Sequence, residues 1–156
     1  MSNVVITMNV NVTTLFQLYQ NGSTISQINA QLGTIITHSV TNGRLIQDPS
    51  YPNDSTKDTI EVTGGDTITW KVHPSVGGIT EQSKCVFINI AAKGNGSITV
   101  LSAAAQGADP SFSGQQQLNA TALQVIGTND YAITFTINNR QLTFDPKIKV
   151  KGQSSF

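Results

Sequence analysis

The side chains best suited to redox-metal or nucleophilic chemistry are few: His38, His73 and Cys85. Two His side chains and one Cys thiolate, with a weak axial Met, are the ligands of a blue-copper site. No His or Met follows Cys85, so such a site would have to be assembled from scattered positions. We therefore expect Cys85 to be a small buried residue that opens a core strand, which is the usual role of a free cysteine.

Other catalytic and metal-binding patterns are incomplete as well. A closed zinc site needs four N or S ligands, and the sequence has no CxxC or HxxxH pair. It also has no GxSxG motif, and its glycine pairs lack the following Lys of a phosphate loop. The sequence thus predicts no enzyme, no cofactor, and no catalytic, cofactor-binding or metal site.

The two histidines have structural interpretations. His38 is in register with Ile36 and Val40 on an expected strand, which predicts a partly buried strand residue. His73 precedes Pro74, and we expect it to be exposed in a loop.

The expected loop 48–57, with Asp58 directly after it, could bind a ligand. Calcium stays open as an alternative, because the segment supplies oxygen donors at Asp48, Asn53, Asp54 and Asp58, although such residues more often form turns. Tyr51, between Pro49 and Pro52, is the aromatic residue that we place on an exposed loop. It is a candidate contact for a sugar, but a lone loop tyrosine more often packs against its own loop.

The elements that must position these residues are mostly strands, because apolar residues alternate along the chain. We expect short helices at 13–19, capped by Thr13, and at 23–32, stopped by Gly33. Asn42-Gly43 predicts a tight hairpin. The loops are expected at 48–57, 73–78 and 103–117, and the strands at 3–12, 34–40, 44–47, 59–62, 67–72, 85–90, 97–101, 118–126, 131–137, 141–144 and 148–150.

Short strands separated by turn residues predict an all-β fold. We expect a two-layer antiparallel β-sandwich, Ig-like or jelly-roll-like, with one or two short N-terminal helices, as a single domain over residues 1–156. The expected core residues are the inward positions of these strands, namely Val4, Ile6, Met8, Ile36, Ile60, Val62, Ile68, Trp70, Val86, Ile88, Val100, Leu123, Val125, Ile133, Phe135, Ile137 and Phe144.

The composition is poor in charge and rich in uncharged polar residues. Only 12% of residues are charged and the formal net charge is zero, whereas 59 of the 156 residues are Asn, Gln, Ser or Thr. A neutral surface has no basic excess for phosphates, so neither nucleic acid nor a membrane surface is an expected partner. Such a surface also does little to repel copies of itself.

The first residues favour a cytoplasmic location. The first Lys or Arg is Arg44, so the positive region of a secretory signal is missing. No apolar run approaches the length of a membrane span. A single cysteine agrees with this, because small secreted domains usually carry paired cysteines.

Several blocks together resemble the bacterial PixA/AidA inclusion-body protein family. These are the opening strand with Thr13–Tyr19, the segment 34–47, the strand Gly65–Lys71, and the closing hairpin 131–144 followed by Asp145-Pro146-Lys147-Ile148. Lys71 replaces the Arg of the family's strand, and the aromatic residues before Asp-Pro are reduced to Phe144. The resemblance implies a non-enzymatic β-sandwich that accumulates in the cytoplasm, sometimes as inclusions.

Three functions remain open. The first is an accessory protein that associates with itself, expected from the charge-poor surface, the open strand edges of a sandwich and the family resemblance. The second is a carbohydrate-binding module that uses the amide-rich loops and Tyr51. The third is a virion or fimbrial surface protein, which an Asn- and Thr-rich β domain also suits.

Overall fold

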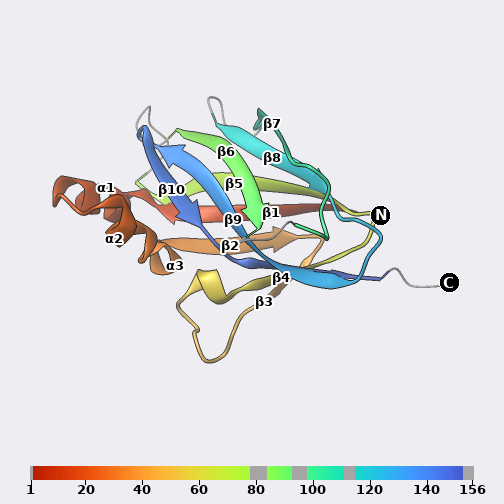
Figure 1. The fold of residues 1–156 in the computed structure, drawn as a ribbon. Coiled ribbons are helices and arrows are strands. Elements are labelled where there is room, and N and C mark those ends of the chain that lie inside the picture. The colour runs from red at the N-terminus through yellow and green to blue at the C-terminus, as the bar shows by residue number, and fades with distance from the viewer. Residues whose placement is uncertain (1, 78–83, 93–97, 111–114, 153–156) are drawn as a thin grey trace.

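The computed structural model describes residues 2–77, 84–92, 98–110 and 115–152. Three short helices lie together at one end of the molecule, and the two termini lie at the opposite end (Figure 1). They are α1 (Val12–Gln20), α2 (Ile25–Asn29) and α3 (Leu32–Ile35), and a single-turn 3₁₀ helix, η1, spans Ser55–Lys57. None of the described helices is long and apolar enough to cross a membrane.

The strands form two sheets. The first has the order β2 (Ile36–Thr41), β1 (Asn3–Asn11), β5 (Thr67–Val76), β8 (Gln116–Thr121) and β7 (Ala105–Ala108). The second has the order β10 (Arg140–Phe144), β9 (Gly127–Ile137), β11 (Lys147–Lys151), β4 (Thr59–Thr63) and β3 (Arg44–Ile46), with β6 (Cys85–Ala92) also paired to β9. The chain is therefore predominantly β, as predicted.

Both sheets are mixed, so the expectation of purely antiparallel pairing is wrong. β1 runs parallel to β5, and β11 runs parallel to β4. The reason is that the chain changes sheet between consecutive strands, as it does from β4 to β5. Successive strands such as β4 and β5 then lie in different sheets, and strands far apart in the sequence, such as β1 and β5, become parallel partners.

The Asn42-Gly43 turn joins two sheets rather than two strands of a hairpin. Asn42 adopts the positive φ of 62° that the dipeptide predicts. However, β2 pairs with β1, whereas β3 pairs with β4. Gly43 is needed for close packing here, because a Cβ atom would lie 2.9 Å from Val4 Cγ1 and 3.3 Å from the Glu61 carbonyl oxygen. The prediction of a turn at Asn42-Gly43 is therefore confirmed, whereas the prediction that the turn closes a hairpin is wrong.

Other boundaries differ from the sequence predictions. β5 continues through Val76, so His73 lies on a strand rather than in a loop, and β7 lies within the expected loop 103–117. β6 pairs with β9 instead of with the expected strand 97–101. The described residues of that expected strand form a single β-bridge, between Leu101 and Ala122. The closing hairpin is confirmed, because Asn138 and Asn139 both have positive φ between the antiparallel strands β9 and β10.

Side chains cap the first turns of α1 and α2, whereas α3 has no side-chain cap. Asn11, rather than the expected Thr13, accepts a hydrogen bond from the Thr14 amide at α1. Thr24 and Gln27 form a capping box at α2. α3 continues through Gly33, which we had expected to be a stop.

The two sheets and the helices enclose one apolar core. Thirteen of the seventeen expected core residues are buried, while Val86, Ile88, Leu123 and Val125 are 45%, 44%, 38% and 45% exposed. On β6 the alternation is displaced by one residue, so that Cys85 and Phe87 point inward. On β8 and just after it the buried positions are Leu118, Ala120 and Ala122, so Leu123 and Val125 fall on the opposite, outward alternation beyond the end of the strand at Thr121.

Candidate functional site

His38 and Asp58 form a buried pair at the edge of the first sheet. β2 alternates, so His38 shares the inward face with Ile36, and Asp58 directly follows η1. His38 Nδ1 lies 2.8 Å from Asp58 Oδ2, and the two residues are 8% and 5% exposed. The His38 ring also packs against Phe144, with 5.3 Å between ring centroids. The bond to Asp58 fixes the orientation of the His38 ring, with Nδ1 towards the carboxylate and Nε2 away from it.

The loop that carries Asp58 is fastened to α3 and β2. Ser55 Oγ lies within hydrogen-bond distance of the carbonyl oxygens of Gly33, at 3.1 Å, and of Ile36. Asp54 Oδ1 accepts a hydrogen bond from the Thr56 amide. Asp54 also lies directly over Gly33, where an added Cβ atom would be 2.0 Å from Asp54 Oδ1. Gly33 therefore allows the loop to approach α3 closely.

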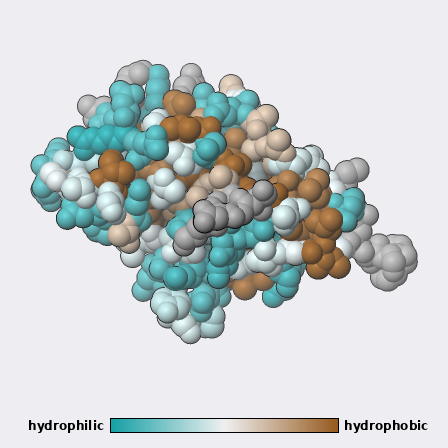
Figure 2. Space-filling view, viewed as in Figure 1, coloured by the Kyte–Doolittle hydropathy of each residue, from teal (hydrophilic) through white to brown (hydrophobic). Residues whose placement is uncertain are grey.

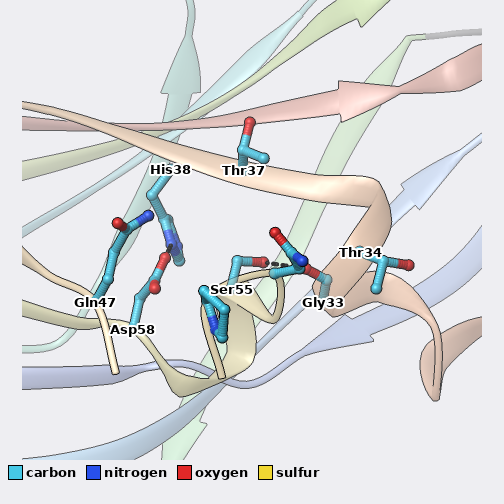
Figure 3. Close-up of a pocket in the computed structure, with 9 residues that line it drawn as sticks. Gly33, Thr34, Thr37, His38, Gln47, Ser55 and Asp58 are labelled. Atoms are coloured by element: carbon cyan, nitrogen blue, oxygen red, sulfur yellow. Dashed lines mark hydrogen bonds and ion pairs between the residues drawn. The ribbon is translucent and has the colours of Figure 1, made fainter. Parts of the chain in front are cut away.

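A pocket of about 330 Å³ opens beside this pair. Figure 3 shows His38, Gln47 and Asp58 on one side of the pocket, with Ser55 and Gly33 on the other. Its lining residues are Gly33, Thr34, Thr37, His38, Gln47, Pro52, Asn53, Ser55 and Asp58. The lining is thus hydroxyl, amide and carboxylate groups around one buried histidine.

The presence of Ser, His and Asp in one pocket does not make a catalytic triad. A triad needs a hydrogen bond from the nucleophile to the base. Ser55 Oγ is instead engaged by backbone carbonyl oxygens, and His38 Nε2, which is buried, has no hydrogen-bond partner among the described residues. Ser55, His38 and Asp58 therefore do not have the geometry of an acyl-transfer triad.

Two acidic residues of the loop form local turns, and a third binds His38. Asp48 accepts a hydrogen bond from the Ser50 amide, Asp54 caps η1, and Asp58 binds His38. Within the described ranges, no three His, Cys, Asp or Glu side chains gather at one place.

A second polar cluster lies where β5 meets the residues after β7. Asp109, which is 4% exposed, lies with its carboxylate 3.0 Å from His73 Nε2 and 3.2 Å from Lys71 Nζ. This cluster joins a strand that we had expected to end at residue 72 to a segment that we had expected to be a loop. Its partners were not visible in the sequence because they depend on the pairing of β5 with β8 and of β8 with β7.

Two core groups are held in their neutral forms. Burial raises the pKa of the Cys85 thiol, which agrees with the expected role of a buried core residue. Burial also raises the pKa of Tyr131, an effect that the Trp70 hydrogen bond opposes and that the Asp58 carboxylate reinforces. Trp70 Nε1 donates to Tyr131 Oη over 3.3 Å and so links the two sheets.

Tyr51 is exposed on the same loop as the pocket. It is 52% exposed and is adjacent to Pro52, which lines the pocket. The Lys57 ammonium lies 5.3 Å from the centroid of its ring. One face of the ring is thus in contact with its own loop, and the role of Tyr51 as a ligand contact stays a prediction.

Sequence reasoning placed His38 on the inward side of a strand, but it considered Asp58 only as a calcium donor or a turn former and did not pair the two. The inward register of His38 was the useful clue, because a buried polar side chain requires a partner. The 20-residue separation and the intervening loop hide which acid supplies it.

Several apolar side chains lie at the surface, including four that we expect in the core. Leu123, Val125 and Ile126, called here the apolar segment, precede β9, and Ile126 is 79% exposed. Figure 2 shows hydrophobic side chains at the surface near the start of β9. Val86 and Ile88 form a second exposed pair on β6.

Comparison with solved structures gives a match over nearly the whole chain. The crystal structure of an inclusion body protein (PixA) from Burkholderia cenocepacia J2315 matches with a TM-score of 0.63 and 10% identity, over 96% of this chain and 95% of that one. The solution structure of amebosin matches with a TM-score of 0.36 and 20% identity, over 62% of this chain and 91% of that one, which is too low to support an argument. No family model and no curated protein matches. The suspected resemblance is therefore confirmed in structure, and the chain has a PixA-like fold.

Proposed function

We propose that this protein is a non-enzymatic, cytoplasmic accessory protein of the inclusion-body type, a single β-sandwich domain that associates with copies of itself. The fold shared with the Burkholderia inclusion body protein supports the type. Self-association rests on an observation from this chain: Leu123 and Val125, which the alternation assigns to the core, are exposed beside Ile126.

Exposed apolar residues are not unusual singly, but three within four consecutive positions are. The apolar segment places Leu123, Val125 and Ile126 in water with only Gln124 between them. Covering this area in a contact between copies would remove it from water at a gain of roughly 25 cal/mol per Å². The zero net charge offers no long-range repulsion against such a contact.

Sedimentation velocity over a range of concentrations tests the proposal. We expect the wild-type protein to form dimers or larger species in a concentration-dependent way. Ile126→Lys should weaken this association, because a charge would have to be buried in the contact. Ser26→Lys is the matched control, since it adds the same charge at an exposed position of α2, and it should leave the association unchanged.

Two results would refute the proposal. One is a wild-type protein that remains a monomer at millimolar concentration. The other is an equal loss of association in Ile126→Lys and Ser26→Lys, which would mean that net charge, and not the apolar segment, governs the assembly.

A further inference from the structure

Two polar atoms of the His38–Asp58 pair are left without partners. Asp58 Oδ2 binds His38, whereas Asp58 Oδ1 makes no hydrogen bond within the described part of the chain. His38 Nε2 is buried and is likewise unpartnered there. A buried polar atom such as His38 Nε2 is almost always satisfied in folded proteins, and an exception points to a strained or functional position. Asp58 Oδ1, by contrast, is not fully buried and is open to the pocket. Both residues line the 330 Å³ pocket.

The charges around the pocket decide which class of ligand fits. The lining includes a carboxylate but no Lys or Arg, so an anion would find no counter-charge. The Asp58 carboxylate is already bonded to His38, which reduces its pull on a free cation. A neutral ligand that both donates and accepts hydrogen bonds matches this lining best.

The neutral side chains add to this match. The amides of Gln47 and Asn53 each supply donors and an acceptor, and neither makes a hydrogen bond within the described residues. Thr34 and Thr37 lie at the rim, where the Thr34 hydroxyl already donates to the Gln31 carbonyl oxygen, and Pro52 offers an apolar surface. Hydroxyl groups on a ring, with C–H faces between them, present the complementary surface.

From this arrangement we propose that the pocket between α3, β2 and the 47–58 loop binds a neutral, polyhydroxylated ligand the size of one sugar ring. The volume lies near the lower end of ligand pockets, which begin at roughly 300 Å³. A hydroxyl group of the ligand donates to Asp58 Oδ1, while the Gln47 and Asn53 amides fix its orientation. The site shares no residue with the apolar segment or with β6, so it stands independently of self-association.

Isothermal titration calorimetry with methyl glycosides of glucose, galactose, mannose and N-acetylglucosamine, and with myo-inositol, tests the proposal. We expect at least one of these probes to bind saturably at one site per chain, with a dissociation constant of about 1 mM or lower. Inorganic phosphate and methylammonium serve as the anionic and cationic probes and should give no saturable heat.

Three variants locate the site. Gln47→Ala combined with Asn53→Ala removes two exposed amides and should weaken binding about tenfold. Asp58→Asn keeps an acceptor for His38 but replaces the carboxylate, and it should weaken binding to a similar degree, about tenfold. Gln20→Ala removes an exposed amide at the end of α1, outside the pocket, and should bind like the wild type.

Several outcomes would overturn the proposal. The absence of saturable heat from every sugar and from inositol shows that the pocket does not take this class. Binding that is unchanged in Gln47→Ala/Asn53→Ala places the ligand elsewhere. Saturable binding of methylammonium or phosphate alone assigns the pocket to an ion. None of these results bears on the self-association proposal, because the sedimentation experiment tests the apolar segment, which shares no residue with the pocket.

Discussion

At the scale of single residues, Asp58 connects the loop, the first sheet and the second sheet. Its carboxylate binds His38 on β2, and its carbonyl oxygen accepts a hydrogen bond from the Lys147 amide at the start of β11. Its neighbour Ser55 holds the same loop to the end of α3. The His38–Asp58 pair therefore connects the two sheets and also lines the pocket.

Asp58→Ala is expected to destabilise the fold by about 3 kcal/mol, because it leaves His38 buried without any partner. Urea unfolding followed by tryptophan fluorescence measures this, since Trp70 is fully buried. Asp58→Asn retains an acceptor for His38 Nδ1, so its free energy of unfolding should fall clearly less than that of Asp58→Ala. Asp48→Ala, a loop acid that only caps a local turn, is the control. If Asp58→Ala and Asp48→Ala cost the same, the pair contributes nothing beyond loop structure.

At the scale of elements, α1 is held to the closing hairpin by one tyrosine. The Tyr19 hydroxyl donates to the Ile137 carbonyl oxygen over 3.4 Å, and the Arg140 guanidinium lies 4.1 Å from the centroid of the Tyr19 ring. A cation over an aromatic face attracts it without needing a fixed hydrogen bond. Burial raises the pKa of Tyr19 to about 12, while the Arg140 charge acts in the opposite direction.

This contact predicts a dependence of stability on alkaline pH. The folded pKa of Tyr19 lies above the ordinary value of 10. Its contribution is therefore fully present below pH 10 and is lost as the pH rises towards 12. Urea midpoints between pH 8 and pH 12 should fall less steeply for Tyr19→Phe than for the wild type, because Phe cannot ionise in the unfolded chain. Tyr51→Phe, at an exposed site, is the control, and curves of equal slope for wild type and Tyr19→Phe would contradict the prediction.

The sequence predicted elements better than their partners. Alternation located β1, β4 and the inward face of β9, and the asparagine pair located the closing turn, because these features depend on neighbours in the chain. It did not show that β1 and β5 are parallel, since their contact spans about 60 residues of sequence. The pocket was hidden for the same reason: Asp58 reaches His38 only after the chain has changed sheet at Asn42 and Gly43.

At the scale of the whole molecule, glutamines cover an edge that could have paired with another chain. Gln106 Nε2 donates to the Phe87 and Ile88 carbonyl oxygens of β6, while Gln115 and Gln116 accept from the Cys85 and Phe87 amides. Edge strands usually need charged residues or a covering element to prevent pairing. Here uncharged side chains do this for β6, which disfavours strand addition at this edge.

Association through apolar contacts has a characteristic response to salt. With a formal net charge of zero, screening by sodium chloride removes no net repulsion, so sedimentation profiles should stay nearly constant from low to moderate sodium chloride. Ammonium sulfate strengthens the burial of apolar surface and should shift the same profiles towards larger species. Ile126→Lys should shift less at equal sulfate, because it lacks the most exposed apolar side chain. Dissociation by sodium chloride would instead assign the contact to ion pairs, for which Glu61 with Lys149 and Lys151, a charge cluster on the second sheet, would be the first candidates.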